Sequence, residues 1–164
     1  MEDRTVTISG FGKTFAVTGW RIGYACAMNP LSLGIRTVHD FTTICAPAPL
    51  QAACAVALDL PDSYYRQVRL DYEERRAKMM SILNRAKLSA QSPEGAYYVM
   101  ADFGDWDFDG DDHSFARWLP ANLGVAVVPG STFYGTKGMG KTSVRFAFAK
   151  KMETLQAAED RLCR

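Results

Sequence analysis

The segment Ser9–Tyr24 reads SGFGKTFAVTGWRIGY and constrains the fold of this 164-residue chain more than any other part. Gly10 and Gly12 leave the backbone bare beside Lys13, so the chain can turn tightly there and a planar ligand can approach the amine. Arg21 follows the lysine within the same segment. We therefore expect a turn that carries a lysine and lies close to an arginine.

These two basic side chains suggest a specific chemistry. A partly desolvated lysine loses its proton more readily and becomes a nucleophile that can form a Schiff base with an aldehyde. The donors of an arginine match the oxygens of a phosphate. Pyridoxal 5'-phosphate (PLP) carries both groups, and its chemistry requires such a lysine. Lys13 and Arg21 are therefore candidate PLP ligands, and the alternative is that both lie on an ordinary surface turn.

The hydrophobic patterns predict alternating strands and helices. The expected strands are Thr5–Ile8, Arg21–Ala27, Tyr97–Asp102, Val125–Val128 and Val144–Ala149. The expected helices are Asn29–Phe41, Gln51–Leu60, Pro61–Ala86, Asp112–Leu123 and Met152–Leu162, with a proline-broken loop over Cys45–Leu50. We expect an α/β protein that divides into residues 1–70 and residues 71–164, the second part being a small α+β sandwich.

Composition excludes several classes of function. The formal net charge of +1 gives no electrostatic reason to expect nucleic acid or a membrane as partner. No apolar run approaches the roughly eighteen residues of a membrane span, and the N-terminus lacks a signal-peptide pattern. The four cysteines are scattered without metal-ligand spacing, which indicates reduced thiols of a cytoplasmic protein.

Arg145 is a second candidate site residue. In the expected strand VRFAFA, Val144 and Phe146 share one face with Phe148, whereas Arg145 alternates with them and shares its face with alanines. An arginine among small residues leaves room for a planar anion to bind it through two hydrogen bonds. The alternative is an exposed strand arginine with no ligand.

Two further motifs imitate known sites. Gly135–Thr142 reads GTKGMGKT and fits the phosphate-loop pattern, but such a loop must open a helix, and the residues that follow alternate as a strand. Nucleotide binding is therefore the alternative function and a glycine-rich loop the preferred interpretation. Asp105–Gly110 imitates the start of a calcium loop, but Ala116 occupies the position that needs a bidentate glutamate. No metal site is predicted.

The chain resembles the class I and II aminotransferases, which are fold-type I PLP enzymes. The resemblance begins with the lysine motif, in which Gly10, Phe11, Gly12, Lys13, Gly19 and Arg21–Gly23 stand where the family has them. It continues through three landmarks of the branch that contains kynurenine and methionine aminotransferases, namely Pro93–Phe103, Gly124–Tyr134 and Ser143–Leu162.

The resemblance implies a fold and a set of roles. Residues 1–70 would be the remnant of a large PLP-binding domain and residues 71–164 the C-terminal small domain. Lys13 would hold PLP and act as general base and acid, Arg21 would bind its phosphate, and Arg145 the substrate α-carboxylate. Many members place a hydroxyl where Gly10 stands, which leaves Ser9 or Thr14 to supply it, with Ser9 as the candidate.

The resemblance also implies a reaction. The intact protein would be a cytoplasmic homodimer of amino acid metabolism that moves an amino group to a 2-oxo acid by a ping-pong mechanism. Dicarboxylate-specific relatives have an arginine where residues 40–44 have none, so an apolar or aromatic donor is expected. Family members are much longer, so we expect this chain to be the C-terminal part and to be inactive alone. An inactive fragment or interaction domain remains an alternative function.

Overall fold

The structure is a computed structural model that describes residues 1–163. The chain divides into two compact units, Met1–Val68 (unit 1) and Arg69–Arg164 (unit 2), and each is described by itself. This boundary and the expected one after residue 70 both fall inside the long helix α3 (Asp62–Arg85).

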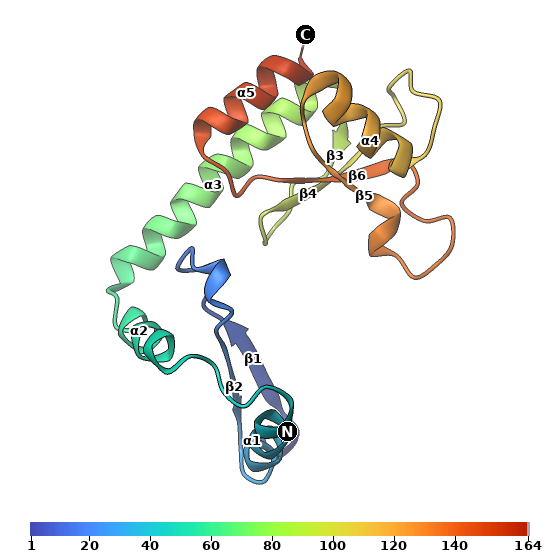
Figure 1. Cartoon of the computed structure of the whole chain (residues 1–164). Helices are drawn as coiled ribbons and strands as arrows, with labels where there is room; N and C mark the ends of the chain where they lie inside the picture. Colours follow the sequence, from blue (N-terminus) through green and yellow to red (C-terminus); the bar gives the residue numbers. More distant parts are fainter. Residues whose placement is uncertain (164) are drawn as a thin grey trace. The chain divides into compact units, whose positions relative to one another are not determined.

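Unit 1 is built on a two-stranded antiparallel hairpin. Its elements in chain order are the short 3-10 helix η1 (Glu2–Arg4), β1 (Val6–Gly10), the 3-10 helix η2 (Thr18–Trp20), β2 (Gly23–Ala27), α1 (Leu31–Thr42) and α2 (Ala48–Leu58), followed by the start of α3 (Figure 1). The strand, glycine-rich turn and strand expected from the sequence are therefore present, and the turn lies between Gly10 and Gly23.

Unit 1 buries few of its apolar side chains. Its buried cluster consists of Phe11, Ile22 and Cys54. By contrast, Ile8 is 78% exposed on the hairpin and Phe41 is 90% exposed on α1. Isolated soluble domains rarely leave so many large apolar groups uncovered, so these faces of unit 1 have the character of contact surfaces.

Unit 2 is a four-stranded antiparallel sheet with helices, in the strand order β3-β4-β6-β5. Its elements are the main part of α3, β3 (Ser89–Ala90), β4 (Tyr98–Asp102), α4 (Asp112–Leu123), β5 (Val128–Pro129), the 3-10 helix η3 (Gly130–Phe133), β6 (Ser143–Ala147) and α5 (Met152–Leu162). Helices α3 and α5 lie side by side (Figure 1). Across residues 1–163, no helix combines enough length and apolar character to cross a membrane.

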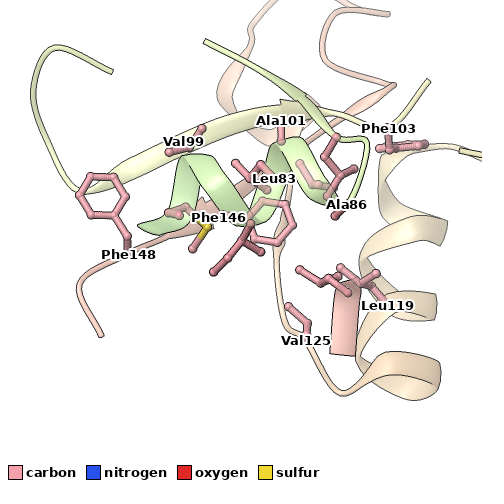
Figure 2. Close-up of a cluster of buried hydrophobic side chains, with 14 of the residues drawn as sticks. Leu83, Ala86, Val99, Ala101, Phe103, Leu119, Val125, Phe146 and Phe148 are labelled. Atoms are coloured by element: carbon pink, nitrogen blue, oxygen red, sulfur yellow. The ribbon is translucent and has the colours of Figure 1, made fainter. Parts of the chain in front are cut away.

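The core of unit 2 lies on one face of this sheet. Val99 and Ala101 of β4 and Val144 and Phe146 of β6 are buried, whereas the residues between them are only half-buried. Figure 2 shows the buried strand side chains gathered with Leu83 of α3 and Leu119 of α4. The predicted alternation of both strands is therefore confirmed, because side chains of successive strand residues point to opposite faces.

Some boundaries differ from the expected ones. Helix α2 begins at Ala48 instead of residue 51, because Pro49 lies in its first turn, where the missing N–H has no helical partner to lose. Only Val128 of the expected strand at residues 125–128 pairs with β6, since α4 ends at the left-handed Gly124 and the chain must first return to the sheet. Strand β3 was not predicted, because two residues are too few to show an alternation.

A buried carboxylate joins the helices of unit 2. Glu159 of α5 is buried and accepts hydrogen bonds from Lys78 and Arg85 of α3. The hydrogen bond from Lys78 lowers the pKa of Glu159 below its ordinary value of 4.5, and the nearby charges of Lys78 and Arg85 act in the same direction against the opposing effect of burial. The ionised form of Glu159 therefore stabilises the contact between α3 and α5.

We predict that Phe115→Ala destabilises unit 2 by about 3–5 kcal/mol. Phe115 is fully buried and stacks on Phe103 with ring centroids 4.1 Å apart, so truncation leaves a cavity that its aromatic neighbours cannot fill. Urea unfolding of the whole chain measures the effect. Phe41→Ala, on an exposed helix position, is the control and is expected to change the unfolding midpoint little; a small effect at Phe115 would contradict the assigned core.

We predict a pH-dependent effect of Glu159→Gln. Because the folded-state pKa of Glu159 is lowered, its stabilising contribution is complete above about pH 4.5 and is lost as the pH falls through the folded value. The variant should therefore unfold at lower urea concentration than the parent at neutral pH, and the difference should narrow in acid. Glu94→Gln, at an exposed position, is the control. A difference that stays constant with pH would contradict the assignment.

Candidate active site

The hairpin of unit 1 brings Lys13 and Arg21 to the same end. Strands β1 and β2 pair from Val6 with Ala27 to Gly10 with Gly23. Lys13 lies just after the last residue of β1, and Arg21 lies just before the first residue of β2. The antiparallel register therefore places the two candidate cofactor ligands in the connection that closes one end of the hairpin.

The turn that carries Lys13 is held by backbone and aromatic contacts. The amide of Ala16 donates to the carbonyl of Lys13 at 3.2 Å. The hydroxyl of Tyr64 on α3 donates to the carbonyl of Thr14 at 2.8 Å, and its ring stacks on Phe15. These contacts fix the backbone of the lysine and of the residues that follow it, so Lys13 projects from a defined turn.

Arg21 has an unusual backbone conformation and no acidic partner. Its φ of 55° lies in the left-handed region, which non-glycine residues seldom adopt outside functional or strained positions. One guanidinium nitrogen donates to the carbonyl of Thr18 at 3.2 Å. No carboxylate within residues 1–163 forms an ion pair with it. The remaining donors of Arg21 are therefore available to an anion.

Ser9 lies on the hairpin near the same end. It pairs with Tyr24, one residue before the closing Gly10–Gly23 pair, and its side chain is exposed. Gly23 is needed beside it, since a side-chain carbon there would lie 2.8 Å from the Ser9 carbonyl oxygen. Ser9 therefore adds a hydroxyl to the end of the hairpin that carries Lys13 and Arg21.

This donor set fits PLP. A primary amine suits its aldehyde, and a guanidinium with a hydroxyl suits its phosphate. Lys13 is exposed, so the residues of this chain do not supply the desolvation that the sequence reasoning expected around the amine.

Arg145 lies in unit 2, on the face of the sheet opposite the core. It is half-buried at the centre of β6, where it pairs with Met100 of β4 and Val128 of β5. Its guanidinium carbon lies 4.0 Å from the ring centre of Tyr98 and 4.5 Å from that of Phe133. The side chain is therefore held by two strands and two aromatic rings.

The positive charge of Arg145 has no counterpart within the described residues. No carboxylate of residues 1–163 pairs with it. Its Nε is buried and has no hydrogen-bond partner. Buried polar groups are normally paired, so the unpaired donors of Arg145 could accept an anion such as a carboxylate.

The structure groups the candidate residues by unit. Ser9, Lys13 and Arg21 lie together at one end of the hairpin in unit 1, and Arg145 lies in unit 2. Sequence reasoning missed Tyr98 and Phe133. The alternation at residues 97–102 put Tyr98 on the face opposite Val99, but the sequence alone did not show that this face would carry Arg145.

The glycine-rich segment Gly135–Thr142 lacks the helix that a phosphate loop needs. It runs directly into β6, and the hydroxyl of Thr142 donates to Asp102 at 2.6 Å. Gly140 has a φ of 73° and packs against the ring of Tyr134. The alternative of a nucleotide-binding module is therefore not supported, as the strand pattern after the loop predicted.

Comparison with known proteins agrees with the resemblance seen in the sequence. The chain is 36% identical over 162 residues to a methionine aminotransferase of Escherichia coli and 33% identical over 177 residues to human kynurenine–oxoglutarate transaminase 3. These alignments cover 99% and 98% of this chain but only 42% and 39% of the two relatives. The chain therefore spans about two fifths of the length of the curated relatives it matches.

Solved structures match the fold of the described chain. The structure of N-succinyldiaminopimelate aminotransferase from Mycobacterium tuberculosis is 34% identical with a TM-score of 0.92, over 99% of this chain and 42% of that one. An aromatic aminotransferase from Pyrococcus horikoshii is 32% identical with a TM-score of 0.87, over 100% of this chain and 43% of that one. The family model for aminotransferase class I and II matches residues 1–162. The chain thus belongs to the class I and II aminotransferase family.

Proposed function

We propose that this chain supplies the lysine and the substrate-binding arginine of a PLP-dependent aminotransferase. The proposal rests on two groups of side chains, one in each unit. Lys13, Arg21 and Ser9 lie at the same end of the hairpin of unit 1, and a guanidinium without a hydrogen-bond partner at Nε lies on the sheet of unit 2. The first set suits an aldehyde and a phosphate, and the second suits a carboxylate.

The residues of unit 1 would hold the cofactor. Lys13 would bind PLP covalently through Nζ, and Arg21 with Ser9 would bind its phosphate. When bound, PLP withdraws electrons from the substrate and makes the proton on the substrate Cα acidic. The left-handed backbone at Arg21 and its bond to Thr18 support this role, because they orient the guanidinium before a phosphate binds.

Lys13 would also move the proton. With the cofactor bound, Nζ of Lys13 would accept the proton from the substrate Cα and later give it up, as general base and then general acid. This role requires an amine on a fixed backbone with a mobile side chain. The hydrogen bonds around Thr14 and Ala16 provide that fixed backbone.

Arg145 would bind the α-carboxylate of the substrate. A planar guanidinium can hold a carboxylate by two parallel hydrogen bonds, which fixes both the position and the orientation of the substrate. For the amino donor we propose an apolar or aromatic amino acid, because residues 40–44 offer no second arginine for a distal carboxylate. The acceptor would be a 2-oxo acid.

Assembly and compartment are part of the same proposal. The uncovered apolar side chains of unit 1, such as Phe41 on α1, support a homodimer of the complete enzyme. The four cysteines are free thiols in the structure, which supports a reducing compartment such as the cytoplasm and a role in amino acid metabolism there. Light scattering of the purified complete enzyme would test the dimer.

We predict that Lys13→Ala abolishes transamination. The assay uses a chimera in which these residues replace the matching part of the E. coli methionine aminotransferase, whose alignment covers 99% of this chain. Loss of a general base alone costs about 10²–10⁴-fold in rate, and loss of the covalent link adds to this. Borohydride treatment with PLP, followed by peptide mapping, should place the reduced label on Lys13.

The matched control is Lys141→Ala, which removes the lysine of the phosphate-loop-like segment. This variant should retain turnover and PLP labelling close to those of the parent chimera, because Lys141 lies on an exposed turn of unit 2. Labelling at a lysine other than Lys13 would contradict the proposal. A folded parent chimera that fails to turn over any amino acid would contradict it as well.

A further inference from the structure

Two aromatic rings hold the Arg145 guanidinium in a single orientation. Its central carbon lies 4.0 Å from the centre of the Tyr98 ring and 4.5 Å from that of Phe133. Both distances are within the range in which a cation is attracted by the electron-rich face of an aromatic ring. Neither ring can accept the in-plane hydrogen bonds of a guanidinium, so these contacts leave its N–H groups without partners.

The orientation of Arg145 leaves one of its buried hydrogen-bond donors without an acceptor. Its buried Nε–H donates to no acceptor within the described residues. A side chain that could rotate would turn such a donor toward water or a carbonyl, because a buried unmade hydrogen bond is unfavourable. We infer that the attraction between the rings and the guanidinium outweighs the free-energy cost of the missing hydrogen bond. The terminal nitrogens of Arg145 are left for a ligand.

The two rings are themselves anchored in unit 2. The hydroxyl of Tyr98 donates to that of Tyr97 at 2.8 Å, and its backbone pairs with Ala147 of β6. Phe133 ends η3, and the buried carboxylate of Asp112 accepts a hydrogen bond from the amide of Ser131 in that helix at 2.7 Å. Both rings are therefore held by contacts within unit 2.

We propose that Tyr98 and Phe133 are positioning residues that hold Arg145 in its carboxylate-binding orientation before the substrate arrives. A guanidinium that is already immobile loses little conformational entropy on binding, and this saving appears as affinity. The identity of the ligand as a substrate carboxylate rests on the proposed function. The positioning role itself rests on the contacts of unit 2 and needs no cofactor.

The experiment uses the whole 164-residue chain with arginine labelled by 15N. The Nε–H of Arg145 is buried, so we expect it to exchange slowly enough with water to be observed, and its signal is assigned by its loss in Arg145→Lys. The probes are sodium acetate, the simplest carboxylate, and acetamide, its neutral analogue. Two quantities are measured in each variant: the order parameter of the Arg145 Nε–H bond and the dissociation constant for acetate.

Replacing either ring should loosen Arg145. We expect Tyr98→Leu and Phe133→Leu to lower the order parameter of its Nε–H bond and to weaken acetate binding by about threefold to tenfold each. Tyr98→Phe keeps the ring and should retain both the rigid signal and the acetate affinity of the parent. Phe108→Leu is the matched control, because its ring contacts Phe103 and Phe115 but not Arg145.

The outcomes separate the two proposals. A rigid Arg145 with unchanged acetate affinity in both leucine variants would overturn the positioning role and leave Arg145 as a carboxylate ligand. Equal losses in Phe108→Leu would also overturn it, because the effect would then follow from general destabilisation. If the parent chain bound acetate no better than acetamide, the carboxylate role of Arg145 would fail, whereas the test of Lys13 with PLP would be unaffected.

Discussion

The pairing of β4 with β6 is the interaction on which unit 2 depends. Because the two strands pair in antiparallel register, Val99 lies opposite Phe146 and Ala101 opposite Val144, and all four side chains reach the core. The same register places Met100 opposite Arg145 on the other face. One set of backbone hydrogen bonds therefore builds the core and presents the arginine at the same time. A slip of one residue would exchange the two faces and bury the charge.

The strand register of the hairpin in unit 1 also sets the positions of its candidate site residues, but fewer buried side chains stabilise it. Its register closes at Gly10 and Gly23 and thereby brings the turn of Lys13 near Arg21. The strand residues are mostly exposed, and the buried cluster of this unit has only three members. Local contacts, such as the stacking of Phe15 on Tyr64, thus carry much of the order around the lysine. Unit 1 thus leaves large apolar side chains such as Ile8 and Phe41 exposed, whereas unit 2 buries a larger core.

Two charged residues of unit 2, Glu159 and Arg145, differ in whether an opposite charge pairs with them. Glu159 is buried, but Lys78 and Arg85 pair with it and hold α5 against α3. Arg145 is half-buried with no acidic partner within residues 1–163, and aromatic rings replace the ion pair. An unpaired cation does not stabilise a fold, which is why we propose a ligand that supplies the negative charge at Arg145.

Much of this protein was determined by local sequence. The alternation at residues 97–102 and 143–148 predicted two strands, and in the second also the face that enters the core. The sequence also predicted the bounds of helices α4 and α5. The glycines and the lysine of the first turn, with Arg21 and Arg145, were sufficient to indicate the chemistry. These features follow from propensities and periods that act within a few residues.

Other features depend on contacts that the sequence does not encode locally. Strand β3 exists only because β4 offers it an edge, and β5 is short because Gly124 first redirects the chain. The approach of Tyr98 and Phe133 to Arg145 joins three segments that are far apart in sequence. It arises from the sheet register and from the bond of Asp112 to Ser131. The sequence therefore indicated which residues are candidates for the chemistry. Tertiary packing decided how Arg145 is held, because the rings that contact it are brought together only by the sheet.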